Sequence, residues 1–200
     1  MLITKFDNES DWLDARRAKI TGTKLKDIIV KRGTGRKIGF YQLLADRLAI
    51  EDDENPMERG HRLEVEAIDE LTKQTGVTFN TDLVIITRTD NSNIAWSPDG
   101  YKEDLTQAVE VKCLKSAIHL QALIEQKIPS DYEEQCIQAF IVDDKLETLY
   151  FVFYDPRVIS KPFHYIEVKR SEVQDEVELY KVYEEQVLKE IDELVEKLAW

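Results

Sequence analysis

Apolar residues recur at helical spacing in some stretches of the chain and form short runs in others. The helical spacing predicts two pieces within 12–30, then helices over 40–50, 57–75, 116–126, 130–142 and 171–200. The short runs predict strands over 82–87, 94–96, 108–113, 146–154 and 163–168. Helices and strands are therefore mixed along the chain, which predicts an α/β (α+β) fold.

The strand predicted over 108–113 has two unlike faces. Side chains alternate along a strand, so Val109 and Val111 lie on one face while Glu110 and Lys112 lie on the other. Asp99 precedes this strand in the loop SPDG. The pattern therefore brings two carboxylates and an ammonium toward one place, although a solvated surface strand would have the same alternation.

A carboxylate also interrupts the apolar stripe of the helix predicted over 57–75. Glu64 lies in the row of small and apolar residues formed by Gly60, Ala67, Ile68 and Leu71. A buried, unpaired charge is costly. Glu64 is therefore expected either to meet a basic partner or a metal ion, or to lie at the edge of the stripe.

Two features concern the ends and faces of the later helices. Ser130 and Glu133 have the spacing of a capping box for the helix that runs to Val142. The acidic tail over 171–200 carries apolar residues at three- and four-residue steps. We expect this helix to cover the sheet rather than to form a coiled coil.

Composition narrows the class of protein. The 200 residues are 42% hydrophobic, enough for one domain over residues 1–200. No run is apolar enough for a membrane span and no leader is evident, so we expect a soluble, cytoplasmic protein without membrane association. Cys113 and Cys136 are expected to be reduced and buried, and the three histidines lack zinc-ligand spacing.

Charge is distributed unevenly. The net charge is −13, yet Ala15 to Phe40 holds nine basic residues and one acid, a local charge of +8. The basic residues are Arg16, Arg17, Lys19, Lys24, Lys26, Lys31, Arg32, Arg36 and Lys37. A basic segment of this density suits phosphate contact, while a solvated basic helix and loop is the alternative.

Asp99, Glu110 and Lys112 have the chemistry of a magnesium-dependent phosphodiesterase. Mg²⁺ prefers oxygen ligands and takes one or two carboxylates together with water and substrate phosphate. Hydrolysis of a phosphodiester needs a nucleophilic water and charge stabilisation at the phosphoryl oxygens. Lys112 could orient or deprotonate that water.

These three residues match the PD-(D/E)XK nuclease signature, and the rest of the chain resembles the lambda exonuclease (YqaJ-type) branch of phage recombination nucleases. The matching motifs, in the order of that family, are W-x3-R-x3-I-T-x-T from Trp12, G-x3-E-x2-A from Gly60, S-P-D-G from Ser97, E-V-K-C from Glu110, Y-x2-Q-x2-Q from Tyr132, and Y-D-P-R from Tyr154. The resemblance implies a restriction-endonuclease-like core, in which a central mixed sheet is flanked by helices.

The resemblance also implies roles for individual residues. Glu64, Asp99, Glu110 and the carbonyl of Val111 would surround Mg²⁺, for which Mn²⁺ could substitute. Lys112 would place or activate the attacking water, and Gln135 would organise the lysine or the water. Arg16, Thr23 and Ser97 would hold the 5′-terminal phosphate of DNA.

The activity that the resemblance implies is 5′→3′ digestion of one strand of linear duplex DNA to mononucleotides. The 3′ single strand that remains would serve recombination by strand annealing. The family also implies a homotrimeric ring and a single-strand annealing protein as partner. Two alternatives remain: an endonuclease or junction resolvase of the same fold, and a non-catalytic module with a DNA-binding arm.

Overall fold

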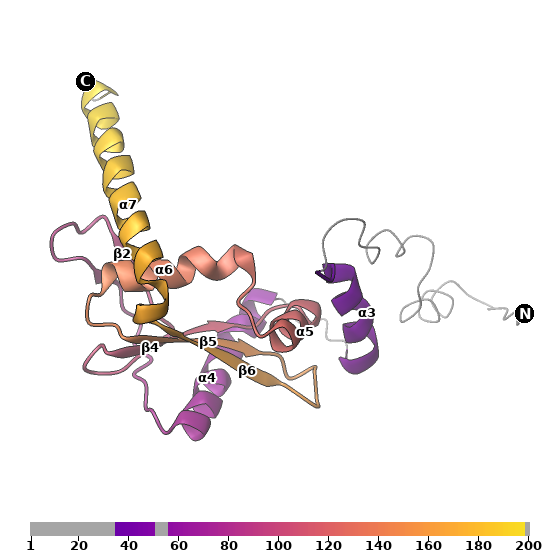
Figure 1. Cartoon of the computed structure of the whole chain (residues 1–200). Coiled ribbons are helices and arrows are strands. Elements are labelled where there is room, and N and C mark those ends of the chain that lie inside the picture. Colours follow the sequence, from indigo (N-terminus) through magenta and orange to yellow (C-terminus); the bar gives the residue numbers. More distant parts are fainter. Residues whose placement is uncertain (1–34, 51–55, 199–200) are drawn as a thin grey trace, which may run out of the picture.

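The computed structural model describes residues 35–50 and 56–198, and the side chains of 56–59 and 61 are not described (Figure 1). The helical pieces predicted within 12–30 lie outside these ranges. The helices are α3 (Ile38–Leu48), α4 (Pro56–Thr75), α5 (Ser116–Glu125), the 3₁₀ turn η1 (Ser130–Tyr132), α6 (Glu133–Val142) and α7 (Arg170–Leu198). The strands are β1 (Ile86–Thr87), β2 (Ala95–Trp96), β3 (Gly100–Tyr101), β4 (Gln107–Lys112), β5 (Thr148–Tyr154) and β6 (Phe163–Lys169).

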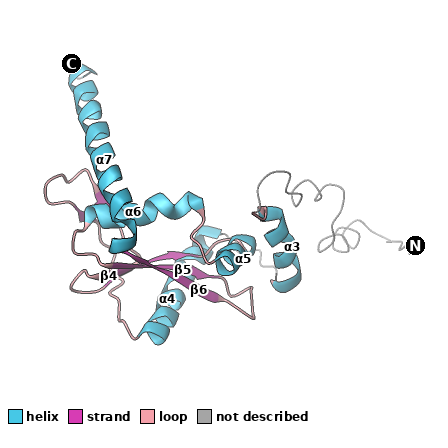
Figure 2. Ribbon diagram, viewed as in Figure 1, coloured by secondary structure: helices cyan, strands magenta, loops and turns pink. Residues whose placement is uncertain are grey.

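A mixed sheet of four strands forms the centre of the fold, in the order β3-β4-β5-β6. The pair β4 and β5 is parallel, whereas β3 with β4 and β5 with β6 are antiparallel. The parallel pair needs a crossover, and α5 and α6 supply it on one face of the sheet (Figure 2). Strands β1 and β2 form a separate two-stranded sheet.

Helices cover both faces of the sheet, so the core has two layers (Figure 1). Val109 and Val111 of β4 pack with Ala67 and Leu71 of α4 on one face. On the other face, Phe151 and Phe153 of β5 pack against α6. The predicted fold class, a mixed sheet flanked by helices, is therefore confirmed. None of the helices in the described ranges is long and apolar enough to span a membrane.

The strand predicted over 82–87 is wrong for most of its length. Only Ile86–Thr87 forms a strand, and Leu83 and Ile85 are 103% and 75% exposed. The Asp82 N–H donates to Asn80 Oδ1 at 2.8 Å, which turns the chain just before the apolar run. A run of apolar residues alone did not reveal that residues 82–85 pair with no strand among the described residues.

The capping box predicted at Ser130 and Glu133 is also wrong. Ser130 begins the 3₁₀ turn η1, and α6 begins at Glu133 with Tyr132 as its N-cap. No side-chain hydrogen bond caps the helix at Tyr132. The extra turn moves the helix start by three residues, so Ser130 is no longer in the capping position. Gly76, by contrast, ends α4 as expected, with a positive φ of 74°.

The carboxy-terminal helix α7 covers less of the fold than expected. Its first half packs on α6 and β6, where Val177 is buried and Val173 and Tyr180 are partly buried. Its second half projects away from the sheet (Figure 1). The expectation that the whole helix covers the sheet is therefore wrong for this second half.

Gly100 is the point where the loop SPDG comes closest to β4. A Cβ atom at Gly100 would lie 2.7 Å from Val109 Cγ1 and 3.3 Å from Phe79 Cβ. We expect Gly100→Ala to lower the free energy of unfolding by about 1–3 kcal/mol, because the stiff valine must move within a packed core. Urea unfolding measures this loss.

Gly60 is the matched control for that substitution. Apart from the backbone of helix α4 itself, no heavy atom of the described residues lies within 4 Å of a Cβ built at Gly60. Alanine there should stabilise the protein by about 0.5–1 kcal/mol through helix propensity. Equal effects at Gly60 and Gly100 would contradict the close approach of the loop to β4.

Candidate active site

Glu110 and Lys112 leave strand β4 on the face that lies against α6. Val109 and Val111 point to the opposite face, so the alternation predicted for this strand is confirmed. The Glu110 and Lys112 side chains are only 5% and 18% exposed. A solvated surface strand is thereby excluded, and the two charges need a local reason to be buried.

The ammonium of Lys112 is held by one charge and two aromatic rings. Its Nζ donates to Glu110 Oε1 at 2.7 Å. It also lies 5.5 Å from the centroid of the Tyr132 ring and 6.0 Å from that of Phe151. Aromatic faces attract cations, so the two rings fix the ammonium without adding negative charge.

Asp99 is fixed against β4 by the main chain. Its Oδ2 accepts a hydrogen bond from the Val111 N–H at 2.6 Å. Burial, the charge of Glu110 and the charge of Glu64 raise the pKa of Asp99 to about 7, although the Val111 bond and Lys112 act in the opposite direction. Asp99 and Glu110 therefore bring more negative charge to this site than the single positive charge of Lys112 neutralises.

Gln135 reaches the site from α6. Its Nε2 donates to Glu110 Oε1 at 2.5 Å, the same oxygen that accepts from Lys112. The other oxygen, Glu110 Oε2, is buried and has no hydrogen-bond partner among the described residues. Gln135 thus orients the glutamate and leaves one carboxylate oxygen for another ligand.

Glu64 lies on α4, one turn before Ile68, whose side chain approaches Gly100. Its side chain is partly exposed, and its charge acts on Asp99. Within residues 35–50 and 56–198, no three His, Cys, Asp or Glu side chains are close enough together to hold a metal ion. Of the two neighbouring carboxylates, Glu110 acts on Asp99 more strongly than Glu64 does.

The site suits a divalent cation by its chemistry. Mg²⁺ binds through one or two carboxylates and keeps several waters, so Asp99 and Glu110 are a sufficient set of side chains. A cation would partner the free Glu110 Oε2 and offset the repulsion that raises the pKa of Asp99. The residues present therefore fit Mg²⁺.

The residues predicted to hold a 5′-phosphate are only partly placed. Ser97 is exposed, and its hydroxyl donates to the Val84 carbonyl at 2.6 Å. Arg16 and Thr23 lie outside the described residues. Ser97 is two residues before Asp99 in the chain.

The two cysteines differ in their surroundings. Neither forms a disulfide; Cys136 is buried, and Cys113 is partly exposed, so the prediction that both are buried is wrong for Cys113. Burial, and then the charge of Glu110, raise the pKa of Cys136 to about 12. The Cys136 thiol therefore stays protonated beside the site and is a poor metal ligand.

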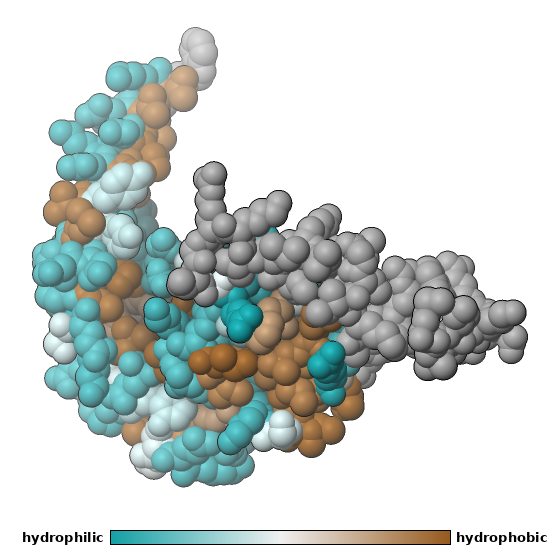
Figure 3. All heavy atoms as spheres, turned by 45° about the vertical axis from the view of Figure 1, so that its right-hand side comes forward, coloured by the Kyte–Doolittle hydropathy of each residue, from teal (hydrophilic) through white to brown (hydrophobic). Residues whose placement is uncertain are grey.

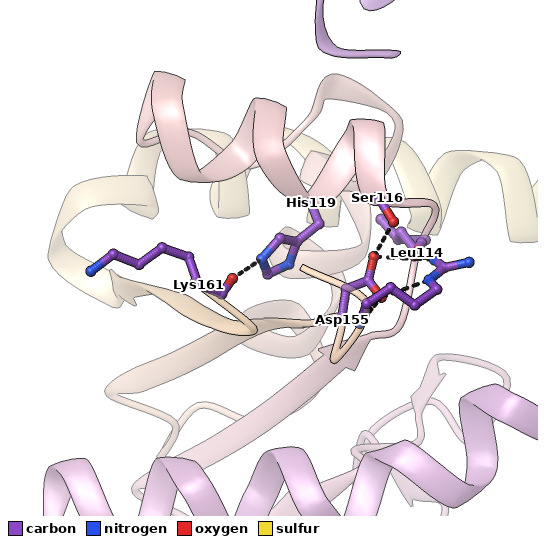
Figure 4. A network of polar contacts seen from close by, with 6 residues as sticks. Leu114, Ser116, His119, Asp155 and Lys161 are labelled. Carbon is purple, nitrogen blue, oxygen red and sulfur yellow. Dashed lines mark hydrogen bonds and ion pairs between the residues drawn. The ribbon is translucent and has the colours of Figure 1, made fainter. Parts of the chain in front are cut away.

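A buried polar network fixes the chain where it leaves β4 (Figure 4). Asp155 is fully buried and accepts from Ser116 Oγ at 2.5 Å and from Arg157 Nε at 2.8 Å. Arg157 Nη2 also donates to the Leu114 carbonyl at 3.0 Å. Burial raises the pKa of Asp155, but the hydrogen bonds from Arg157 and Ser116 outweigh it and leave the pKa below its ordinary value.

His119 belongs to the same region and is an ordinary core histidine. Its Nε2 lies 2.7 Å from the Lys161 carbonyl oxygen (Figure 4). Burial lowers the pKa of His119, so the ring is neutral and Nε2 donates to that carbonyl. Its place is on the side of α5 that faces the β5–β6 connection, away from the carboxylate site.

Sequence reasoning missed the part that Tyr132 plays. The spacing of Tyr132 and Gln135 puts both near one face of a helix, yet the ring acts on Lys112 from the adjoining 3₁₀ turn. Periodicity does not reveal such a contact between two elements. The signal available in the sequence was Lys112 in one predicted strand and the aromatic run FVFY in another.

Comparison with known structures agrees with the fold described above. The chain has 24% identity to the crystal structure of LHK-Exo in complex with dAMP, with a TM-score of 0.60 over 96% of this chain and 98% of that one. A crystal structure of an alkaline exonuclease (LHK-Exo) from Laribacter hongkongensis has 23% identity and a TM-score of 0.54, over 96% and 100%. These likenesses show the fold.

None of the curated protein sequences matches the chain significantly. Residues 11–145, by contrast, match the model of the YqaJ-like viral recombinase domain. The match includes Asp99, Glu110, Lys112 and Gln135. The chain therefore belongs to the YqaJ-like viral recombinase domain family.

Proposed function

We propose that this protein is a Mg²⁺-dependent 5′→3′ exonuclease that digests one strand of linear duplex DNA. It would release mononucleotides and leave a 3′ single strand for recombination by strand annealing. The observation that carries the proposal is the buried pair Glu110 and Lys112 beside Asp99. Membership of the YqaJ-like family and the likeness to an alkaline exonuclease support the broader part of the proposal, a recombination exonuclease.

The chemistry assigned to the site is hydrolysis of a phosphodiester. A bound Mg²⁺, or Mn²⁺ in its place, would supply charge stabilisation for the phosphoryl oxygens. Asp99, Glu110 and the Val111 carbonyl would hold it, with Glu64 adding negative charge nearby. Lys112 would orient the attacking water, since its ammonium has protons left after its bond to Glu110.

The residues around this pair complete the proposed site. Gln135 keeps Glu110 in one orientation through the bond to Oε1. Arg16, Thr23 and Ser97 are proposed to receive the terminal 5′-phosphate, which would place the first phosphodiester at the carboxylates. A homotrimeric ring and a single-strand annealing partner belong to the same proposal and rest on the family resemblance.

DNA with and without ends tests this activity. With Mg²⁺ present, linear duplex DNA should lose nucleotides steadily, and covalently closed circular DNA should remain intact. A 5′-phosphorylated end should be digested faster than a 5′-hydroxyl end. Cleavage of the closed circle would instead indicate an endonuclease or junction resolvase, and no cleavage of any substrate with Mg²⁺ or Mn²⁺ would favour a non-catalytic module.

A further inference from the structure

The second half of α7 carries an exposed apolar face. The whole helix has 29 residues, which corresponds to a length of about 43 Å. Ile191, Leu194, Val195 and Leu198 are 47%, 53%, 59% and 72% exposed. In the space-filling view, apolar side chains continue along this projecting helix among polar ones (Figure 3). Four large apolar side chains on one exposed helix need a partner.

The apolar positions follow a heptad. We call seam positions the residues at alternating steps of four and three, which would face a partner helix in a coiled coil. They are Val173, Val177, Tyr180, Glu184, Val187, Ile191, Leu194 and Leu198. The first three contact the chain's own core, as does Leu188 just after the seam position Val187, and the exposed apolar residues of the seam begin at Ile191. From Val187 onward, every apolar residue of the helix occupies a seam position or the position just after one. The segment Val187–Leu198, whose apolar side chains are exposed from Ile191 onward, therefore has the pattern of a coiled-coil helix.

The charges of this half identify what covers the seam. Glu190 and Lys197 each come directly before a seam position, so they flank the seam on the same side, one heptad apart. In an antiparallel pair of identical helices, flanking residues of this kind face each other, so Glu190 would meet Lys197 of the partner subunit twice. In a parallel pair, Glu190 would face an apolar Val195 instead.

The surplus of negative charge does not oppose this pairing. Asp192, Glu193 and Glu196 lie at the outward positions of the heptad, away from the seam. Repulsion between outward charges of two helices is screened by salt because they are far apart. Two of the four positions that flank the seam are charged, Glu190 and Lys197, and the other two are the apolar Leu188 and Val195.

We propose that Val187–Leu198 of α7 pairs antiparallel with the same segment of a second copy of this chain. Ile191 would pack against Leu194 of the partner subunit, and Val187 against Leu198 of the partner subunit. The projection of this half from the sheet leaves room for the two folds at opposite ends of the pair (Figure 1). The contact is two-fold, so it is separate from any ring interface and does not depend on the nuclease activity.

Light scattering of the full chain, over a concentration series, tests the pairing. The double variant Ile191→Lys with Leu194→Lys should halve the mass of the wild-type assembly, whether the basic unit is one chain or a ring. The matched control, Asp192→Lys with Glu196→Lys, adds the same side chains at outward positions and should leave the mass unchanged. Circular dichroism should show equal helix content in all three proteins.

A charge exchange tests the antiparallel register. Glu190→Lys alone and Lys197→Glu alone should each raise the dissociation constant at least tenfold, and the double exchange should restore it. A wild-type mass that the seam variant does not change, including a monomeric wild type, would overturn the proposal. Failure of the double exchange to restore pairing would overturn the antiparallel arrangement, and retained nuclease activity in the seam variant is expected in every case.

Discussion

Glu110→Gln should reduce Mg²⁺-dependent release of nucleotides from linear duplex DNA by at least about a thousandfold. The substitution keeps the size of the side chain but removes the charge and one of the oxygens that fit a cation. A bound metal ion contributes several kcal/mol to such a reaction, and each 1.36 kcal/mol is tenfold in rate. Initial rates measured at saturating Mg²⁺ give the comparison.

Two observations separate this effect from unfolding. Glu134→Gln, at an exposed position of the same helix that carries Gln135, should retain full activity. Glu110→Gln removes the repulsion from Asp99 but also the charge that pairs with Lys112, so the fold is checked by circular dichroism, which should match that of the wild type without metal. A variant that is folded and fully active would show that Glu110 is not part of the catalytic site.

Asp155→Asn should lower the free energy of unfolding by about 3–5 kcal/mol at neutral pH. The carboxylate is fully buried between Ser116 and Arg157, so its loss leaves a guanidinium without its counter-charge. Breaking a buried ion pair from one side is costly for this reason. Asp144→Asn, at an exposed aspartate, should change stability by less than about 0.5 kcal/mol.

The pH dependence of that difference follows from the direction of the pKa shift. The pKa of Asp155 lies below its ordinary value of 3.8 in the folded protein. Its charge therefore stabilises the fold fully above pH 4 and loses this effect as the pH falls through the lower, folded pKa. Urea unfolding of wild type and variant should converge in that acidic range. A constant difference down to the lowest pH would assign the loss to packing alone.

The sequence predicted the fold best where an apolar pattern coincided with burial on both faces. The run predicted over 146–154 became β5, whose first six residues are all buried. The run over 82–87 is equally apolar, yet Leu83 is fully exposed. Strand formation requires a neighbouring strand, and a single segment does not contain that information. The same reason explains α7, where periodicity predicted the helix but not what its second half contacts.

The candidate site was predictable in its residue types and less so in its contacts. Alternation along one strand placed Glu110 and Lys112 together, and the structure brings Asp99 beside them. The bond from Gln135 goes to Glu110, whereas the resemblance had implied that it organises the lysine or the water. Such contacts depend on how α6 lies on the sheet, which spacing within α6 does not determine.

The most direct test of the proposed function follows each end of one strand. A linear duplex carries a 5′-phosphate and a different label at each end of that strand, and products are sampled from the earliest times with Mg²⁺. The account predicts that the 5′ label appears first as a mononucleotide, while the 3′ label stays on progressively shorter strands. First release of the 3′ label, or labelled fragments cut from within the duplex, would contradict a 5′→3′ exonuclease.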